Sequence, residues 1–241
     1  MLDHITIRAT DRAASELFYD TVLKTIGVEQ SSRDGEYTVW KGQFSLAHAD
    51  GDHPVTRRLH IGFAAPSRDA VDEFWRTGTA AGYEDDGKPG PRPQYSEDYY
   101  GSFLLDPDGN SAEAVHHGDT ANRDVIDHMW IGVADVDKAR RFYEQAAPFS
   151  GFSLTSVLPE RVHFGGANGS FGLVARDVTE NLHLAFEAKD NATVDAFHSA
   201  LTQAGYADNG SPGKRAYHPG YYGAFVLDPD GNNVEVVNHD G

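Results

Sequence analysis

Short stretches in which apolar and polar residues alternate recur along the chain, and four of them open with a histidine. In residues 2–8, His4, Thr6 and Arg8 share the polar face of such a stretch. This period of two predicts a strand with one buried face. Each histidine is followed fourteen residues later by a phenylalanine, in the pairs His4 and Phe18, His60 and Phe74, His128 and Phe142, and His183 and Phe197. The chain is therefore predicted to contain four copies of one unit.

Apolar residues at helical spacing follow each of the four strands. In the first unit Asp11 stands where a helix N-cap is expected, and Gly27 provides a stop. The other predicted caps are Ser67, Asp135 or Asp137, and Asp190. Two or three short strands complete each unit, so the predicted order is strand, helix and then strands.

A coarser repeat relates the two halves of the chain. The segment YYGSFLLDPDGN from Tyr99 to Asn110 returns 122 residues later as YYGAFVLDPDGN, and each copy then reaches a glutamate, Glu113 or Glu235. The Asp-Gly pair predicts a turn between strands. The Gly/Pro-rich segments before these copies, residues 87–93 and 210–220, are predicted to be loops.

The chain is long enough for two domains. Its 241 residues exceed one average domain, and the polar segment around residue 120 marks a boundary. We predict a first module over residues 1–118, a linker over 119–124 and a second module over 125–241. Within each half, an ordinary hydrophobic core can form, since 39% of the residues are hydrophobic.

Composition narrows the classes of partner. A formal net charge of −17 repels phosphate backbones and anionic lipid, so neither nucleic acid nor a membrane is an expected partner. The absence of cysteine excludes disulfides, thiolate nucleophiles and zinc sites that use sulfur. No stretch approaches the ~20 apolar residues that span a bilayer, and no leader pattern is present. These features predict a cytoplasmic location.

The strongest candidate chemistry is metal binding. Each half offers two histidines and one glutamate on matching strands: His4, His60 and Glu113, then His128, His183 and Glu235. Burying such groups without partners would cost several kcal/mol, whereas together they form a ligand set for a divalent ion with open positions. Iron(II), manganese, zinc and nickel all suit this set, and retention of the histidines for packing is the alternative. How the units pair stays open, so His4 belongs either with His60 and Glu113 or with His183 and Glu235.

Aromatic residues cluster before the Asp-Pro turn of each module. They form either a packed lip or a set of hydroxyls that point at a substrate. The candidate catalytic residues are His218, Tyr100 and Tyr222. The candidate substrate-binding residues are Arg8, Trp130, Tyr95 and Tyr217.

The repeated unit, its histidines, and Asp-Pro-Asp-Gly-Asn followed by glutamate resemble the vicinal oxygen chelate superfamily. This superfamily contains glyoxalase I, fosfomycin-resistance proteins, bleomycin-binding proteins and type I extradiol dioxygenases. The resemblance covers essentially the whole chain. It implies an α+β fold of two tandem modules, each of two βαβββ units that form a curled, cup-like mixed sheet with helices on the outside. It also implies that the six residues above are metal ligands.

The sequence differs from the pattern of each of these subfamilies, which limits the reactions that the resemblance implies. Glyoxalase I uses a second carboxylate where this chain has Ser45 or Gly172. Extradiol dioxygenases use a further histidine, matched only by His218, and a tyrosine where Phe103 or Phe225 stands. Fosfomycin-resistance proteins need a cationic cradle, and the sequence shows no obvious one. Bleomycin-binding relatives lack the metal ligands.

Two classes of function follow. The first is a divalent-metal-dependent enzyme with lyase, isomerase or dioxygenase chemistry on a small substrate chelated through adjacent oxygens. The second is a non-catalytic protein that binds or sequesters a small molecule, as bleomycin-resistance proteins do. One module could also be catalytic and the other structural. The expected assembly is a monomer with an internal pseudo-dimer, or a homodimer.

Overall fold

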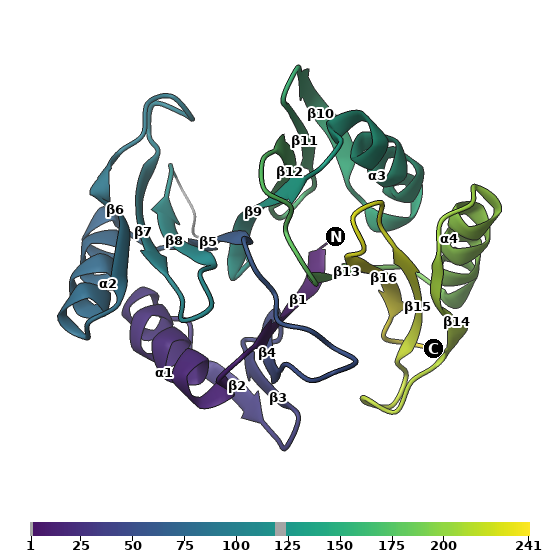
Figure 1. The fold of residues 1–241 in the computed structure, drawn as a ribbon, viewed down its shortest axis with the longest axis horizontal. Coiled ribbons are helices and arrows are strands. Elements are labelled where there is room, and N and C mark those ends of the chain that lie inside the picture. Colours follow the sequence, from purple (N-terminus) through teal and green to yellow (C-terminus); the bar gives the residue numbers. More distant parts are fainter. Residues whose placement is uncertain (1, 119–123) are drawn as a thin grey trace. The chain divides into compact units, whose positions relative to one another are not determined.

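The four predicted units are present in the computed structural model, which describes residues 2–118 and 124–241 (Figure 1). The first unit contains β1 (Leu2–Ala9), α1 (Arg12–Leu23), the 3-10 helix η1 (Lys24–Ile26), β2 (Gln30–Arg33), β3 (Tyr37–Trp40) and β4 (Phe44–His48). The second contains β5 (His60–Ala64), α2 (Arg68–Ala80), β6 (Glu84–Pro91), β7 (Tyr100–Leu105) and β8 (Ser111–His116). The predicted order of strand, helix and strands is confirmed in both.

The second half repeats this order. Its third unit contains β9 (Ile126–Val133), α3 (Val136–Ser150), β10 (Ser153–Leu158), β11 (Arg161–Gly165) and β12 (Ser170–Ala175). The fourth contains β13 (His183–Glu187), α4 (Asn191–Gln203), β14 (Asp208–Lys214), β15 (Tyr222–Leu227) and β16 (Asn233–Asn238). Each α-helix begins after a side chain that accepts a hydrogen bond from the backbone three residues on, and these caps are Asp11, Ser67, Asp135 and Asp190.

The described strands form two eight-stranded mixed sheets, and the sheet order shows how the units pair. One sheet runs β14-β15-β16-β13-β1-β4-β3-β2, and the other runs β10-β11-β12-β9-β5-β8-β7-β6. The first unit thus shares a sheet with the fourth, and the second with the third. Two compact units result: Thr6–Trp130, and Ile131–Gly241 together with the chain start up to Ile5. Of the predicted linker over 119–124, only Asp124 lies within the described residues.

The loop predicted over residues 87–93 is wrong for most of its length. Strand β6 extends to Pro91 and pairs antiparallel with β7. The glycines that suggested a loop are accommodated in the strand: Gly87 lies opposite Phe103, and a Cβ there would come within 2.7 Å of the Phe103 ring. The equivalent strand β14 likewise continues to Lys214, inside the other predicted loop.

The Asp-Pro-Asp-Gly turns hold the strands that carry the glutamates. Asp106 accepts hydrogen bonds from the backbone of Asp108 and Asn110 and from the Tyr19 hydroxyl at 2.9 Å. The Asn110 side chain accepts from the backbone of Leu59, just before β5. This network ties the start of β5 to the buried turn from which β8 leaves.

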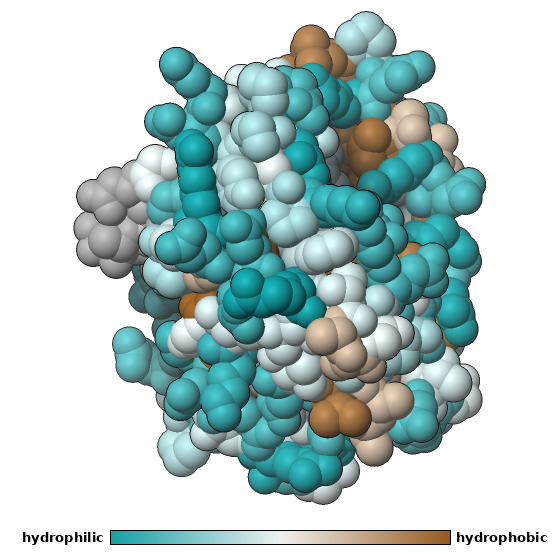
Figure 2. All heavy atoms as spheres, turned by 90° about the vertical axis from the view of Figure 1, so that its left-hand side faces the viewer, coloured by the Kyte–Doolittle hydropathy of each residue, from teal (hydrophilic) through white to brown (hydrophobic). Residues whose placement is uncertain are grey.

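The surface agrees with the acidic composition. Hydrophilic side chains cover most of the face in Figure 2, and the hydrophobic ones form only small patches. None of the helices among the described residues is both long and apolar enough to span a membrane.

Candidate metal centres

Three adjacent strands bring His60, Glu113 and His128 together. The Nε2 atom of His60 lies 3.0 Å from Oε2 of Glu113, and Nε2 of His128 lies 3.2 Å from the same oxygen. The two Nε2 atoms are 3.3 Å apart. Glu113 is buried on β8, and the imidazoles come from β5, which pairs with β8, and from β9, which pairs with β5. This group is called centre A below.

Glycines make room for the side chains of centre A. Gly62 pairs with both Glu113 and His128, and a Cβ at this position would lie 2.3 Å from the His128 ring. Gly101 serves the carboxylate, because a Cβ there would lie 2.3 Å from Oε1 of Glu113. The close approach of the three ligands therefore depends on backbone positions without side chains.

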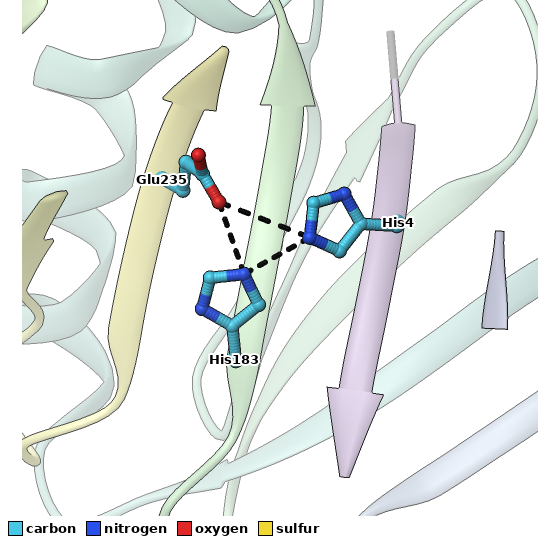
Figure 3. Close-up of side chains that lie close together, drawn as sticks. All are labelled: His4, His183 and Glu235. Carbon is cyan, nitrogen blue, oxygen red and sulfur yellow. Dashed lines mark hydrogen bonds and ion pairs between the residues drawn. The ribbon is translucent and has the colours of Figure 1, made fainter. Parts of the chain in front are cut away.

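A second group, called centre B below, contains His4 on β1, His183 on β13 and Glu235 on β16 (Figure 3). The two Nε2 atoms are 3.1 Å apart, and Oε2 of Glu235 lies 3.1 Å from His183 and 3.8 Å from His4. The alternative that the sequence left open is thus decided: His4 lies with His183 and Glu235. Ala185 stands where centre A has Gly62, and it pairs with Glu235.

In each centre, an aspartate contacts one ligand histidine and also a further histidine. In centre A, Asp127 lies 2.9 Å from Nδ1 of His128 and also contacts His117 at 2.9 Å. The equivalent contacts in centre B, both 2.6 Å, join Asp3 to Nδ1 of His4 and to Nε2 of His239. A carboxylate that accepts from Nδ1 leaves the lone pair of a neutral imidazole on Nε2, the atom that faces the other ligands.

The remaining two imidazoles have different partners. Nδ1 of His60 lies 3.2 Å from the hydroxyl of Ser111, which itself donates to Asp86. Nδ1 of His183 lies 2.7 Å from the amide of Asn233. Every ligand imidazole is therefore oriented through Nδ1, so that Nε2 points at the glutamate. Two imidazole nitrogens and one carboxylate oxygen are donors that suit a divalent transition metal.

Two tyrosines donate to the glutamate oxygens that the histidines do not contact. Tyr99 donates to Oε1 of Glu113 at 2.8 Å, and Tyr221 donates to Oε1 of Glu235 at 2.7 Å. Burial, followed by the nearby carboxylate, raises the pKa of Tyr99 far above its usual value. The hydroxyl therefore stays neutral and remains a donor.

The sequence candidates Tyr100 and Tyr222 lie next to these residues but point elsewhere. Tyr100 donates to Asp72 on α2, and Tyr222 donates to Asp195 on α4, both at 2.8 Å. They lie on the helix-covered face of their strands, because side chains alternate along a strand. The structure therefore brings Tyr99 and Tyr221, and not the two tyrosines selected from the sequence, to the glutamates.

His218 lies near centre B without touching its ligands. It is exposed, and its Nε2 lies 3.0 Å from Nδ1 of His239, which in turn contacts Asp3. The candidate substrate-binding residues Tyr95 and Tyr217 are 54% and 60% exposed. Their rings lie 5.0 Å from Tyr99 and Tyr221, respectively, and so form the outer edge of each centre.

The other two substrate-binding candidates have different surroundings. Trp130 pairs with His60 across β9 and β5, so it shares the face that carries centre A. Arg8 donates to the backbone carbonyl of His48 at 3.1 Å and lies over the Tyr37 ring. The contacts of the Arg8 side chain are therefore with other residues of the first unit.

The charged groups of centre A shift one another's pKa values. Burial would raise the pKa of Glu113, but hydrogen bonds with His128 and His60 lower it to about 2. Burial would lower the pKa of His128, but Asp127 and Glu113 raise it to about 10. Burial would lower the pKa of His4 in centre B, but Asp3 and Glu235 raise it. Both centres therefore favour positive charge beside their carboxylates.

Sequence reasoning missed the residues behind the ligands. Asp3 and Asp127 directly precede ligand histidines, and His117 and His239 are 122 residues apart, as Tyr99 and Tyr221 are. That shared spacing was the available signal. Strict alternation along a strand predicts that each aspartate points to the face opposite the histidine that follows it, and so away from the centre.

Comparisons with known proteins agree with this architecture. Glyoxalase I from Zea mays superposes with a TM-score of 0.70 at 21% identity, covering 99% of this chain and 92% of that one. A putative dioxygenase from Bacillus subtilis gives a TM-score of 0.69 at 13% identity, covering 100% and 85%. At these identities the likeness shows the fold alone. No curated protein matches the sequence.

Family membership rests on the sequence itself. The profile of one superfamily matches residues 1–114 and again residues 125–236. These two matches cover most of the chain and correspond to its two halves. The chain belongs to the Glyoxalase/Bleomycin resistance protein/Dioxygenase superfamily.

Proposed function

We propose that the chain is a divalent-metal-dependent enzyme that acts on a small substrate chelated through two adjacent oxygens. The observation that carries this proposal is the convergence, twice in one chain, of two imidazole Nε2 atoms and one carboxylate oxygen. His60, Glu113 and His128 would hold one ion, and the ligands of centre B would hold a second. When bound, the ion supplies Lewis-acid stabilisation of negative charge on a substrate oxygen.

A ligand set of three residues leaves coordination positions for the substrate. Glyoxalase I, in the resemblance drawn above, fills one more position with a carboxylate where this chain has Ser45. The Ser45 hydroxyl is hydrogen-bonded to the Thr6 hydroxyl at 2.6 Å. This supports a reaction in which the substrate provides two oxygens, and an enolate or oxyanion is stabilised in lyase, isomerase or dioxygenase chemistry.

The surrounding residues have defined tasks in this proposal. Tyr99 and Tyr221 hold the second oxygen of each glutamate, so that the other oxygen faces the imidazoles. Asp127 and Asp3 hold one imidazole of each centre through Nδ1. The ligands are therefore held in place before a substrate arrives, and little ordering remains to be done on binding.

Elemental analysis of the purified protein tests the proposal directly. We expect about two equivalents of metal per chain, one equivalent in either His60→Gln or His183→Gln, and none in the double variant. His53→Gln is the matched control, because His53 is exposed and its imidazole contacts the exposed Asp50. A protein that holds no metal, and whose melting temperature does not change when metal is added, would exclude this function.

Two observations keep alternatives in the test. The exposed rings of Tyr95 and Tyr217 suit a protein that only sequesters a small aromatic compound, and binding that survives His60→Ala with His183→Ala would favour it. Centre B has Ala185 at the position that Gly62 occupies in centre A, and this difference suits a protein with one active centre. Glu113→Gln and Glu235→Gln, assayed separately, distinguish that case, since equal losses of activity contradict it.

A further inference from the structure

Each centre has a nearby guanidinium group for which the described part of the chain provides no carboxylate partner. Arg92 donates to the backbone carbonyl of Lys88 at 2.7 Å, and Arg215 donates to that of Ser211 at 2.7 Å. The other guanidinium hydrogen bond of each arginine also goes to a backbone carbonyl. Among the described residues, neither arginine forms a salt bridge. In a chain with 37 acidic and 20 basic residues, such positions suit an external anion.

An aromatic ring connects each arginine to its centre. The Cζ atom of Arg92 lies 5.4 Å from the ring centroid of Phe103, and this ring lies 5.9 Å from that of His60. Phe103 also pairs directly with Glu113 across β7 and β8, so both side chains share one face of the sheet. The equivalent distances in centre B are 5.2 and 6.1 Å, for the set Arg215, Phe225 and His183.

The backbone beneath this line of residues consists of glycines. A Cβ at Gly87 would collide with the Phe103 ring, and one at Gly90 would lie 3.1 Å from the Arg92 guanidinium. Gly101 does the same for Glu113. The second module repeats the pattern with Gly210, Gly213 and Gly223. In each module the glutamate, the phenylalanine and the arginine of this line therefore lie directly against glycine backbone.

Arg92 also lies beside the tyrosine of its centre. Its backbone N–H donates to the carbonyl of Tyr99 at 2.8 Å, and the Tyr99 side chain binds Glu113. Arg215 and Tyr221 make the same contact at 3.0 Å. The main chain of each arginine is thus paired with the main chain of the tyrosine, and the ring contact and the carbonyl acceptors hold its guanidinium.

We propose that Arg92 and Arg215 form an anion subsite in each centre, and that the substrate is a small carboxylate. Its adjacent oxygens would reach the metal ligands, its body would lie on Phe103 or Phe225, and its carboxylate would pair with the guanidinium. A guanidinium presents five donors in a planar fork that matches a carboxylate, and the contacts above use only part of them. The inference rests on the proposed function, because it assigns the substrate class of the same centres.

A pair of isosteric probes tests the subsite. Calorimetry on the zinc-loaded protein compares 3,4-dihydroxybenzoate with 3,4-dihydroxybenzamide, which share the diol and differ in the charge of the other group. We expect the acid to bind about tenfold more tightly, the size of one charge-assisted hydrogen bond. In R92Q/R215Q this preference should disappear while the affinity for the amide is unchanged. Arg161→Gln, at an exposed arginine on β11, should retain it.

The outcomes separate this inference from the proposed function. Equal affinities for acid and amide in the parent protein, or a preference that persists in R92Q/R215Q, would overturn the subsite. Metal content and the affinity for the amide depend on the metal centre and not on the arginines. A parent protein that holds no metal and does not bind the amide would contradict the enzyme proposal. If the protein takes up no zinc, acid binding that is lost in R92Q/R215Q still supports the subsite, and failure of the acid to bind overturns it.

Discussion

The Tyr99 hydroxyl and the Glu113 carboxylate form a 2.8 Å hydrogen bond that decides which carboxylate oxygen is available to the centre. Oε1 accepts from the tyrosine, and Oε2 faces His60 and His128. Tyr221 and Glu235 repeat the arrangement in the other module. Because the glutamates are 1% exposed, a carboxylate oxygen without this donor would be desolvated and unpaired.

Tyr99→Phe is expected to weaken metal binding at centre A about tenfold to a hundredfold. Loss of a group that orients a metal ligand has effects of this size. Competition with a chromophoric chelator measures the affinity of each centre. Tyr100→Phe is the control, because its hydroxyl binds Asp72 on the helix side and should leave both affinities unchanged. Equal affinities in Tyr99→Phe and the parent protein would show that the hydrogen bond does not position the carboxylate.

Metal uptake by centre A is expected to release a proton near pH 7. The pKa of His128 is raised to about 10, so the metal-free protein carries an imidazolium that must deprotonate before it can bind a metal. Affinity should therefore rise with pH up to about 10. Calorimetry in buffers of different ionisation enthalpy counts the protons released. Release of none at pH 7 would contradict the raised pKa.

The same groups predict how the stability of the metal-free protein depends on pH. Glu113 has a folded pKa of about 2, below its ordinary value of 4.5, so its contribution is present above pH 4.5 and is lost as the pH falls towards 2. His128, with a raised pKa, contributes fully below pH 6.5 and loses that contribution as the pH rises through 10. Urea unfolding of Glu113→Gln should show a flatter acid limb, and an unchanged limb would contradict this linkage.

The regular elements were accessible from sequence because local rules determine them. Asp11, Ser67 and Asp190 cap their helices as predicted, since a short acceptor before an apolar helical pattern satisfies the first free N–H groups. The six candidate ligands were found from repetition and residue chemistry. Their grouping was not accessible, because it depends on which strands pair across the halves of the chain, and no local pattern records that.

The geometry of β6 and β7 explains one wrong prediction and the orientation of one candidate residue. The loop predicted around Gly87 is a strand, because the glycine leaves space for the Phe103 ring opposite it. The candidate Tyr100 faces away from the centre, because side chains alternate along a strand. Phe103 pairs with Glu113, so Tyr99 lies on the same side of its strand as the centre and Tyr100 on the helix side.

The buried bond between Tyr19 and Asp106 is expected to stabilise the turn that leads to β8. Tyr19→Phe removes a 2.9 Å hydrogen bond to a buried carboxylate and should lower the free energy of unfolding by about 1–3 kcal/mol. Tyr143→Phe, which loses the equivalent bond to Asp228, should do the same. Urea titration measures the change. Tyr83→Phe is the control, because Tyr83 is half-buried and its ring packs against Phe18 with 4.8 Å between centroids. A loss as large there would show that the buried hydrogen bond is not the cause.

Gly62→Ala is expected to remove metal from centre A alone. The new Cβ would lie 2.3 Å from the His128 ring, and this ring must shift away from Glu113 because the strand backbone holds position 62 between them. Metal content should fall from about two equivalents to about one. Gly51→Ala, where a Cβ meets nothing within 4 Å, should leave it unchanged. Centre B already has Ala185 at this position, with His4 3.8 Å from Glu235. Two equivalents in folded Gly62→Ala would therefore mean that centre A can adopt the wider spacing of centre B.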